Sequence, residues 1–271
     1  MCPGKVNHPQ PLYEYEGNDI YYWDFVRSLK EAGIQKADTV LVTSDISVFG
    51  KLRLLDRDLL CKALVDAIKE VVGDQGTIVM PTFSYSFCNN DVFDINSTRS
   101  TVGVLTEYFR QQPDTSRTHQ PIFSMAIWGK HQQELLDVGP DCFDRDSIFG
   151  KLHNLHGKFL CFGASFHSCT FLHYVEQLHG VPYRFMKSYT GTIKAGEDVY
   201  EATCTYLVRH LDGSVAYDLT RFEPYLRQNG MLSEARVGSG KMLAVDLDNV
   251  FEQAHNMLDM DIYYFLKEPR K

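Results

Sequence analysis

The sequence predicts an α/β fold: a single domain over residues 1–271 with a central mixed, largely parallel sheet flanked by helices and an added antiparallel region. In the first half, short β-branched runs alternate with segments of helical period, which is typical of strand–helix–strand units in parallel sheets. Residues 190–218 instead alternate Thr, Tyr and Val between glycines, which favours antiparallel strands joined to the core. We find no internal repeat or Pro/Gly/Ser-rich linker, so no boundary divides the chain.

The clearest strand–helix–strand unit lies near the start of this pattern. Residues 39–43 (TVLVT) form a β-branched run that predicts a buried strand. Asp56 then stands where it can cap a helix, whose apolar residues recur at helical period until the expected C-cap at Gly73. A second strand follows at 77–80, and Pro81 is expected to end it.

The remaining elements alternate less regularly. In chain order we expect a helix at 102–110, a strand at 122–128, a helix at 130–138, a strand at 158–162, a helix at about 168–179, antiparallel strands within 190–218 turning at Gly191, Gly196 and Gly213, a strand at 242–245 and a helix at 249–258.

Composition and charge exclude several classes of function. The net charge is −8, so the surface does not offer the basic footprint that nucleic acid or an anionic membrane requires. The first residues contain no apolar core of a signal peptide, and no apolar run approaches the roughly 20 residues that span a bilayer. We expect a soluble, cytoplasmic protein with small-molecule partners, and a homo-oligomer remains open.

Neither a disulfide framework nor a metal site is expected. The seven cysteines are widely spaced and form no CxxC pair. Disulfide scaffolds and zinc ribbons both favour close pairs of cysteines. The ten histidines include no HExxH or other ligand spacing with a carboxylate.

His173 and Glu176 are the candidate catalytic pair. Residues three apart are neighbours on a helix, and a carboxylate beside an imidazole fixes its tautomer and raises its basicity. The predicted helix follows a strand and a glycine loop, so its first turn should lie at the carboxyl edge of the sheet, where ligands bind in open α/β folds. From spacing alone, a solvated His–Glu pair is the commoner outcome. Cys169, on the same helical face, is a competing nucleophile.

Polar side chains follow the first two strands of the predicted sheet. Thr43, Ser44 and Ser47 come just before Gly50, and residues 81–85 (PTFSY) repeat the situation at the next strand. Hydroxyls and free backbone N–H groups at such crossovers commonly hold phosphates or an amide chain such as pantetheine. Ordinary turn chemistry explains the polar residues after either strand taken alone. Polar residues after two successive strands favour a ligand site.

These motifs together resemble the antibiotic N-acetyltransferase family, the aminoglycoside 3-N-acetyltransferase-like acyl-CoA enzymes. The resemblance covers roughly residues 39–190. The matching segments, in order, are 43–50 (TSDISVFG), 76–84 (GTIVMPTFS), Gly103 with the following helix, 117–121 with Ser124, 146–152, and 170–176 (TFLHYVE).

The resemblance implies direct transfer from acyl-CoA (acetyl-CoA or 3-hydroxybutyryl-CoA) to a primary amine in a ternary complex. It implies that His173 is the general base for the amine and that Glu176 is its partner carboxylate. The residues expected to contact CoA are Thr43, Ser44, Ser47, Thr82, Phe83, Ser84, Ser124, Lys151 and Thr170. The residues expected to contact the acceptor are Tyr85, Arg184 and Lys187.

Departures from the family pattern lead us to expect a particular acceptor. Gln120 and Phe123 stand where antibiotic-acting members usually carry histidines, and Thr43 stands where a histidine is common. These changes resemble the branch found with surface-polysaccharide genes, and Arg184 with Lys187 would suit a diphosphate. We therefore expect a dTDP-linked amino-dideoxyhexose as acceptor. An aminoglycoside, which the acidic net charge would suit, is the alternative. A non-catalytic CoA or nucleotide binder is the third hypothesis.

Overall fold

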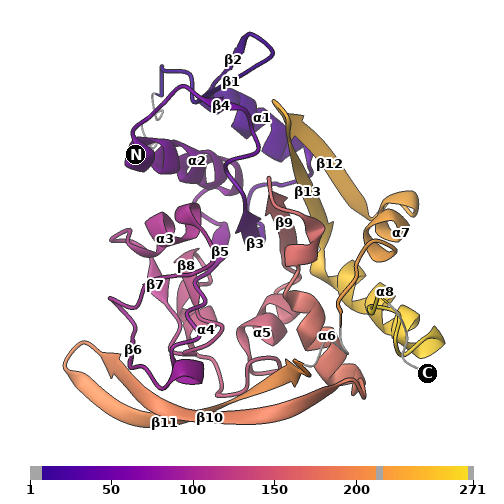
Figure 1. Ribbon diagram of the computed structural model, residues 1–271. Coiled ribbons are helices and arrows are strands. Elements are labelled where there is room, and N and C mark those ends of the chain that lie inside the picture. Colours follow the sequence, from indigo (N-terminus) through magenta and orange to yellow (C-terminus); the bar gives the residue numbers. More distant parts are fainter. Residues whose placement is uncertain (1–7, 212–215, 268–271) are drawn as a thin grey trace.

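The computed structural model describes residues 8–211 and 216–267, and a seven-stranded mixed sheet forms its centre (Figure 1). In this sheet β3 runs parallel to both of its neighbours, β5 and β9, and the outer pairs are antiparallel. The predicted mixed sheet is confirmed, with its parallel strands in the middle. Its strand order is β12 (Leu232–Val237), β13 (Gly240–Asp246), β9 (Lys158–Phe162), β3 (Thr39–Ser44), β5 (Thr77–Pro81), β8 (Met125–Gly129) and β7 (Ser116–Arg117).

Helices pack against both faces of this sheet, and each face has its own hydrophobic core. One core contains the buried faces of α1 (Tyr22–Glu31), α2 (Arg57–Val72) and α3 (Val104–Arg110). The other contains those of α4 (Gln132–Leu136), α5 (Ile148–Asn154), α6 (Phe171–His179), α7 (Phe222–Gln228) and α8 (Leu247–Met260).

The environment of strand β3 explains why its sequence is an unbroken apolar run. Val40 and Val42 lie in the first core, whereas Leu41, between them, lies in the second. Successive side chains of a strand point to opposite faces, so a strand covered on both faces needs apolar residues at every position. The polar exit of β3 therefore begins only at its end, at Thr43 and Ser44.

Two small sheets lie beside the central one. The strands β1 (Tyr13–Tyr15), β2 (Asn18–Ile20) and β4 (Lys51–Leu52) form the first. The second consists of β6 (Phe93–Asp94) and the hairpin β10 (Arg184–Ala195) and β11 (Asp198–Arg209), which extends along the lower edge of the molecule in Figure 1.

The hairpin is the predicted antiparallel region, but it forms a separate sheet and begins earlier than residue 190. Gly191 lies inside β10 and forms no turn. The turn is at Gly196, whose φ of +64° is a conformation that suits glycine. Gly213 falls outside the described residues.

Helix α2 has the predicted boundaries because the two capping residues, Asp56 and Gly73, act locally. The Asp56 carboxylate accepts hydrogen bonds from the backbone N–H groups of Asp58 and Leu59, which have no partner within the helix. Gly73 follows the last turn with φ +66°. Strand β5 is one residue longer than the predicted strand at 77–80, because Pro81 is its last residue.

The boundaries of several other elements were predicted wrongly. The predicted strand at 122–128 is β8, which begins only at Met125, because the Gln120 side chain accepts hydrogen bonds from the backbone N–H groups of Ile122 and Phe123 at 2.7 Å each and holds a turn there. The predicted helix at 168–179 begins at residue 171, after a short 3₁₀ turn, η2 (Phe166–Ser168). Helices α3 and α4 are each shorter than expected.

Within residues 8–211 and 216–267, none of the helices has the length and apolar character needed to cross a bilayer.

Candidate active site

Helix α6 holds the candidate catalytic pair, and its other residues anchor it. Phe171, Leu172 and Val175 are fully buried against the second core, as helical spacing predicts. The helix ends at Gly180, which has φ +81° and lets the chain turn back toward the helix. This return places the residues that follow beside Glu176.

His173 and Glu176 form a direct and largely buried pair. The Nδ1 atom of His173 lies 2.7 Å from Oε2 of Glu176, whose side chain is 0% exposed, whereas that of His173 is 21% exposed. An ionised carboxylate only accepts hydrogen bonds, so Nδ1 carries the proton and Nε2 of the neutral ring keeps a free electron pair. The buried carboxylate excludes a solvated surface pair.

Glu176 is held by two further side chains. The hydroxyl of Tyr183 donates a hydrogen bond to Oε1 of Glu176 at 2.7 Å. Nε of Arg184 lies 3.0 Å from Oε2, an ion pair without hydrogen-bond alignment, and the Arg184 side chain is only 3% exposed. Burial would raise the pKa of Glu176, but His173, Arg184 and Tyr183 together bring it below its ordinary value. The carboxylate is therefore ionised.

His173 is prepared to act as a base near neutral pH. Burial lowers its pKa below the ordinary value of 6.5, the charge of Arg184 adds to this effect, and Glu176 only partly offsets it. The ring packs against the rings of Phe143 and Tyr217, with centroids 5.4 Å away in each case. A neutral imidazole with Nε2 free can accept a proton from a bound group.

Cys169 does not have the environment of a nucleophile. It is fully buried and precedes α6. Burial raises the pKa of its thiol well above the ordinary value, so the thiolate that a nucleophile requires is disfavoured.

The hydroxyls at the exit of β3 lie close to the segment that leads into α6. The Ser168 hydroxyl donates a hydrogen bond to Oγ1 of Thr43 at 2.8 Å. Ser44 is half-buried, and the exposed Ser47 donates to the carboxylate of Asp45 at 2.6 Å. These predicted CoA contacts thus share one edge of the sheet with the approach to His173.

Most of the predicted CoA contacts at the exit of β5 are buried and contact other residues of the protein interior. Thr82 and Ser124 are fully buried, and Nε of Arg117 lies 3.1 Å from each hydroxyl oxygen. Phe83 is buried with its ring centroid 4.7 Å from that of Phe123.

Ser84 is half-buried and donates to the carbonyl of Pro121 at 2.9 Å. Lys151 on α5 and Thr170 just before α6 are also half-buried. Contact of these residues with CoA stays a prediction.

The three predicted acceptor contacts have different surroundings, and their contact with an acceptor stays a prediction. Arg184 faces Glu176, whereas Lys187 is exposed on β10 with its ammonium 4.8 Å from the centroid of the Tyr189 ring. Tyr85 has φ +55° and packs its ring against Phe123.

The contributions of Tyr183 and Tyr217 were not predicted from the sequence. The signal for Tyr183 was the glycine turn at residue 180, which returns the chain to Glu176 within one short loop. Tyr217 carries no such signal, because it comes from a distant segment. Among the residues that the structure describes, no group of three or more His, Cys, Asp or Glu side chains is arranged to hold a metal ion.

Known proteins resemble the chain along most of its length. A family model described as aminoglycoside 3-N-acetyltransferase matches residues 41–259. The aminoglycoside N(3′)-acetyltransferase-like protein YokD of Bacillus subtilis, derived from the SPbeta prophage, is 31% identical over 180 residues, 58% of this chain and 64% of that protein. Aminoglycoside N(3)-acetyltransferase IV of Salmonella sp is 28% identical over 169 residues, 60% of this chain and 62% of that enzyme.

The chain thus spans slightly less than two thirds of the length of these two curated relatives. Among solved structures, AAC-IIIb in its binary complex with CoASH has the same fold, with a TM-score of 0.77 and 20% identity over 92% of this chain and 98% of that one.

The comparisons overturn the expected nucleotide-linked amino sugar. The family model and the curated relatives are of aminoglycoside N-acetyltransferases, not of sugar-nucleotide enzymes. The structure explains why the residue argument failed. Gln120 and Phe123 support a turn and an aromatic cluster, and Arg184 is turned toward Glu176, so it is not a free cation for a diphosphate.

Proposed function

Because the chain belongs to the aminoglycoside 3-N-acetyltransferase family, we propose that it transfers an acetyl group from acetyl-CoA to the 3-amino group of an aminoglycoside. The observation that carries this proposal is the buried His173–Glu176 pair, with Nδ1 of the imidazole 2.7 Å from the carboxylate. The net charge of −8 supports a polycationic acceptor, since it attracts cations over long range.

The proposed reaction requires a base because the acceptor is an ammonium ion near neutral pH. An amine nitrogen attacks a thioester carbonyl only with its electron pair free, and Nε2 of His173 takes the proton that is lost. The N–C bond forms and the C–S bond breaks; the nitrogen releases its second proton as it becomes an amide, the CoA thiolate takes up that proton, and the imidazolium returns the first proton to solvent. The ionised Glu176 stabilises the imidazolium that exists between these steps.

The surroundings of the pair support direct transfer without an acyl-enzyme. The thiol of Cys169 is buried and poorly ionised, whereas His173 keeps part of its side chain exposed. Acyl-CoA is a cytoplasmic metabolite, and the six described cysteines are free, so we place this reaction in the cytoplasm.

The test is a thiol-release assay with acetyl-CoA against a panel of aminoglycosides, with a dTDP-linked amino sugar in parallel. We expect release with aminoglycosides, a product acetylated at N-3 by mass spectrometry and NMR, and a higher drug tolerance of a sensitive host. Loss of release in His173→Ala would link the activity to the pair. No release with any aminoglycoside in the panel, or release only with the sugar nucleotide, would overturn the proposal.

A further inference from the structure

Tyr217 lies beside the catalytic pair, and no step of the proposed reaction uses it. The centroid of its ring is 5.4 Å from that of the His173 ring. The guanidinium carbon of Arg184 lies 5.5 Å from the centroid of the same tyrosine ring. One aromatic ring therefore contacts both the imidazole and the cation that faces Glu176.

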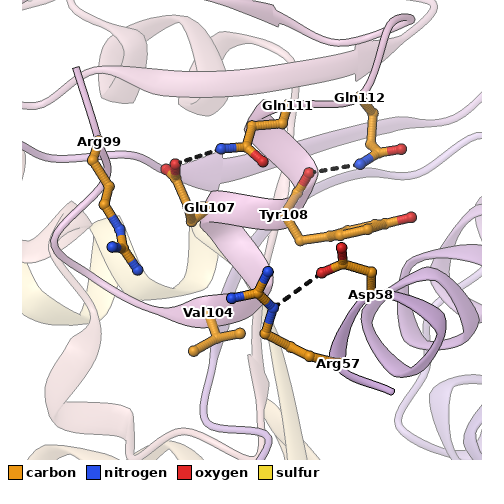
Figure 2. Close-up of a pocket in the computed structure, with 8 residues that line it drawn as sticks. All are labelled: Arg57, Asp58, Arg99, Val104, Glu107, Tyr108, Gln111 and Gln112. Carbon is orange, nitrogen blue, oxygen red and sulfur yellow. Dashed lines mark hydrogen bonds and ion pairs between the residues drawn. The ribbon is translucent and has the colours of Figure 1, made fainter. Parts of the chain in front are cut away.

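The hydroxyl of Tyr217 is buried and has no hydrogen-bond partner in the described part of the chain. Other tyrosines of the molecule have different surroundings. Tyr183 donates to Glu176 at 2.7 Å, and Tyr108 lines the polar pocket between α2 and α3 that Figure 2 shows. A buried hydroxyl without a partner lowers the free energy of unfolding, so a hydrogen bond does not explain the presence of Tyr217. Its ring is the part that contacts the site.

The groups that interact electrostatically with Tyr217 lie on α6 or close to its ends in sequence. They are Glu176, Arg184, Tyr183 and Cys169. Burial raises the pKa of Tyr217 well above its ordinary value, and the charge of Glu176 adds to this effect, so the phenol stays neutral. A neutral ring keeps water away from the catalytic pair without adding a charge to it.

The segment that carries Tyr217 is fixed by residues close to the C-terminus. The backbone N–H of Asp218 donates to the carbonyl of Phe265 at 2.8 Å, and that of Lys267 donates to the carbonyl of Ala216 at 2.8 Å. The Phe265 side chain is fully buried, and its ring centroid is 6.2 Å from that of Tyr217. Two backbone hydrogen bonds and a buried ring thus hold Tyr217 in place, although α6 is distant in sequence.

We propose that Tyr217 is a positioning residue for the base: its ring holds the imidazole of His173 against the Glu176 carboxylate and keeps Arg184 beside them. This inference rests on the proposed function, because it takes His173 as the base. The hydrogen bond between Nδ1 and Glu176 fixes one edge of the imidazole. A packed ring restricts its remaining rotation, so Nε2 keeps one direction toward the acceptor.

Removal of the ring has a directional consequence for His173. Burial and the charge of Arg184 both lower the pKa of the imidazole. In Tyr217→Leu, water reaches the imidazole and the guanidinium loses the ring that it packs against. Both effects then weaken, and the pKa of His173 rises toward 6.5. A residue that only filled space would change stability without changing this titration.

The test is an NMR pH titration of the His173 imidazole in protein with nitrogen-15-labelled histidine, its signals assigned by comparison with His173→Ala. Tyr217→Leu should shift the titration to higher pH and lower kcat for acetyl transfer about 10-fold, because the base is less well oriented. Tyr217→Phe loses only the unpartnered hydroxyl, so it should titrate as the wild type, keep kcat within about two-fold and unfold at a higher urea concentration. If the leucine variant does not fold, Tyr217→Met removes the ring with a smaller loss of volume and gives the same measurement.

Tyr264→Leu is the matched control. Tyr264 lies in the same C-terminal segment as Phe265, and the guanidinium carbon of Arg221 is 4.3 Å from its ring centroid, so this variant loses an equivalent cation–π contact. The Tyr264 ring packs against that of Phe265, with centroids 5.3 Å apart. Stability should fall in this variant, but the titration of His173 and kcat should stay at their wild-type values.

The outcomes separate this inference from the proposed function, because the titration needs no substrate. If Tyr217→Leu shifts the titration and no aminoglycoside is acetylated, the positioning role holds and the proposed function fails. If acetyl transfer occurs and Tyr217→Leu matches the wild type in both titration and kcat, the function holds and the positioning role is overturned. A shift of the same size in Tyr264→Leu or in Tyr217→Phe also overturns it, because neither change removes the ring that contacts His173.

Discussion

Replacing Glu176 with glutamine removes one charge from a buried group of three partners. The glutamine oxygen can still accept from Nδ1 of His173, and the amide can face Tyr183, so the shape of the site is kept. The positive charge of Arg184 then has no partner, because its side chain is 3% exposed and the carboxylate that it faced is gone. We expect both stability and turnover to fall, for separate reasons.

The magnitude of each effect follows from these contacts. Breaking a buried ion pair by removal of one partner costs about 3–5 kcal/mol of unfolding free energy, since it leaves a buried charge unpaired. Turnover should fall by roughly 10- to 100-fold, less than the loss of a general base, because the imidazole remains but the imidazolium loses its counter-charge. The control Glu31→Gln removes an exposed carboxylate 3.8 Å from Arg27 and should cost less than about 1 kcal/mol.

Urea unfolding and steady-state kinetics measure the two effects. The double variant Glu176→Gln with Arg184→Gln separates them: it should regain most of the stability, because no charge remains buried, and should not regain the turnover. A Glu176→Gln protein with unchanged unfolding free energy and unchanged kcat would refute the reasoning. So would a double variant that loses stability additively, since coupled partners should not behave as independent sites.

Three further predictions concern the reaction itself. His173→Ala should lower kcat by roughly 10²–10⁴-fold with CoASH binding retained, which calorimetry can check; an unaltered rate would remove the mechanism. The rate should fall as pH decreases through the pKa of His173, below 6.5, because protonation removes the base, and it should be level across neutral pH. A pH–rate profile still rising above pH 7 would contradict that assignment. Cys169→Ala should keep full kcat, and mass spectrometry of enzyme with acetyl-CoA should show no acyl-enzyme; a covalent acetyl group on Cys169 would instead restore the thiol mechanism.

Elements with local signals were predictable from the sequence. The capping carboxylate of Asp56 and the left-handed Gly73 act within a few residues of the helix they bound, so α2 was predicted well. The hairpin began before its predicted start because residues 184–189 pair with distant partners, such as Arg184 with Arg209, and their side chains show little apolar alternation. Pairing over such a separation leaves no mark in a local pattern.

The catalytic pair was predictable for the same reason, and its environment was not. A spacing of three residues on a helix brings His173 to Glu176 whatever surrounds them. Whether the carboxylate is solvated or buried depends on Tyr183 and Arg184, which arrive through tertiary packing. Gln120 was misread as a signal of the acceptor because a side chain that holds a turn and one that binds a ligand look alike in sequence.

Arg184 is both the partner of Glu176 and the first residue of β10, so the long hairpin and the base share one anchor. At its other end the hairpin is tied to β6 through Ile193 and Phe93. A swing of the hairpin away from α6 would withdraw the guanidinium from the carboxylate before it disturbed the central sheet. Because the charge of Arg184 lowers the pKa of His173, such a movement of the hairpin would raise the proton affinity of the imidazole.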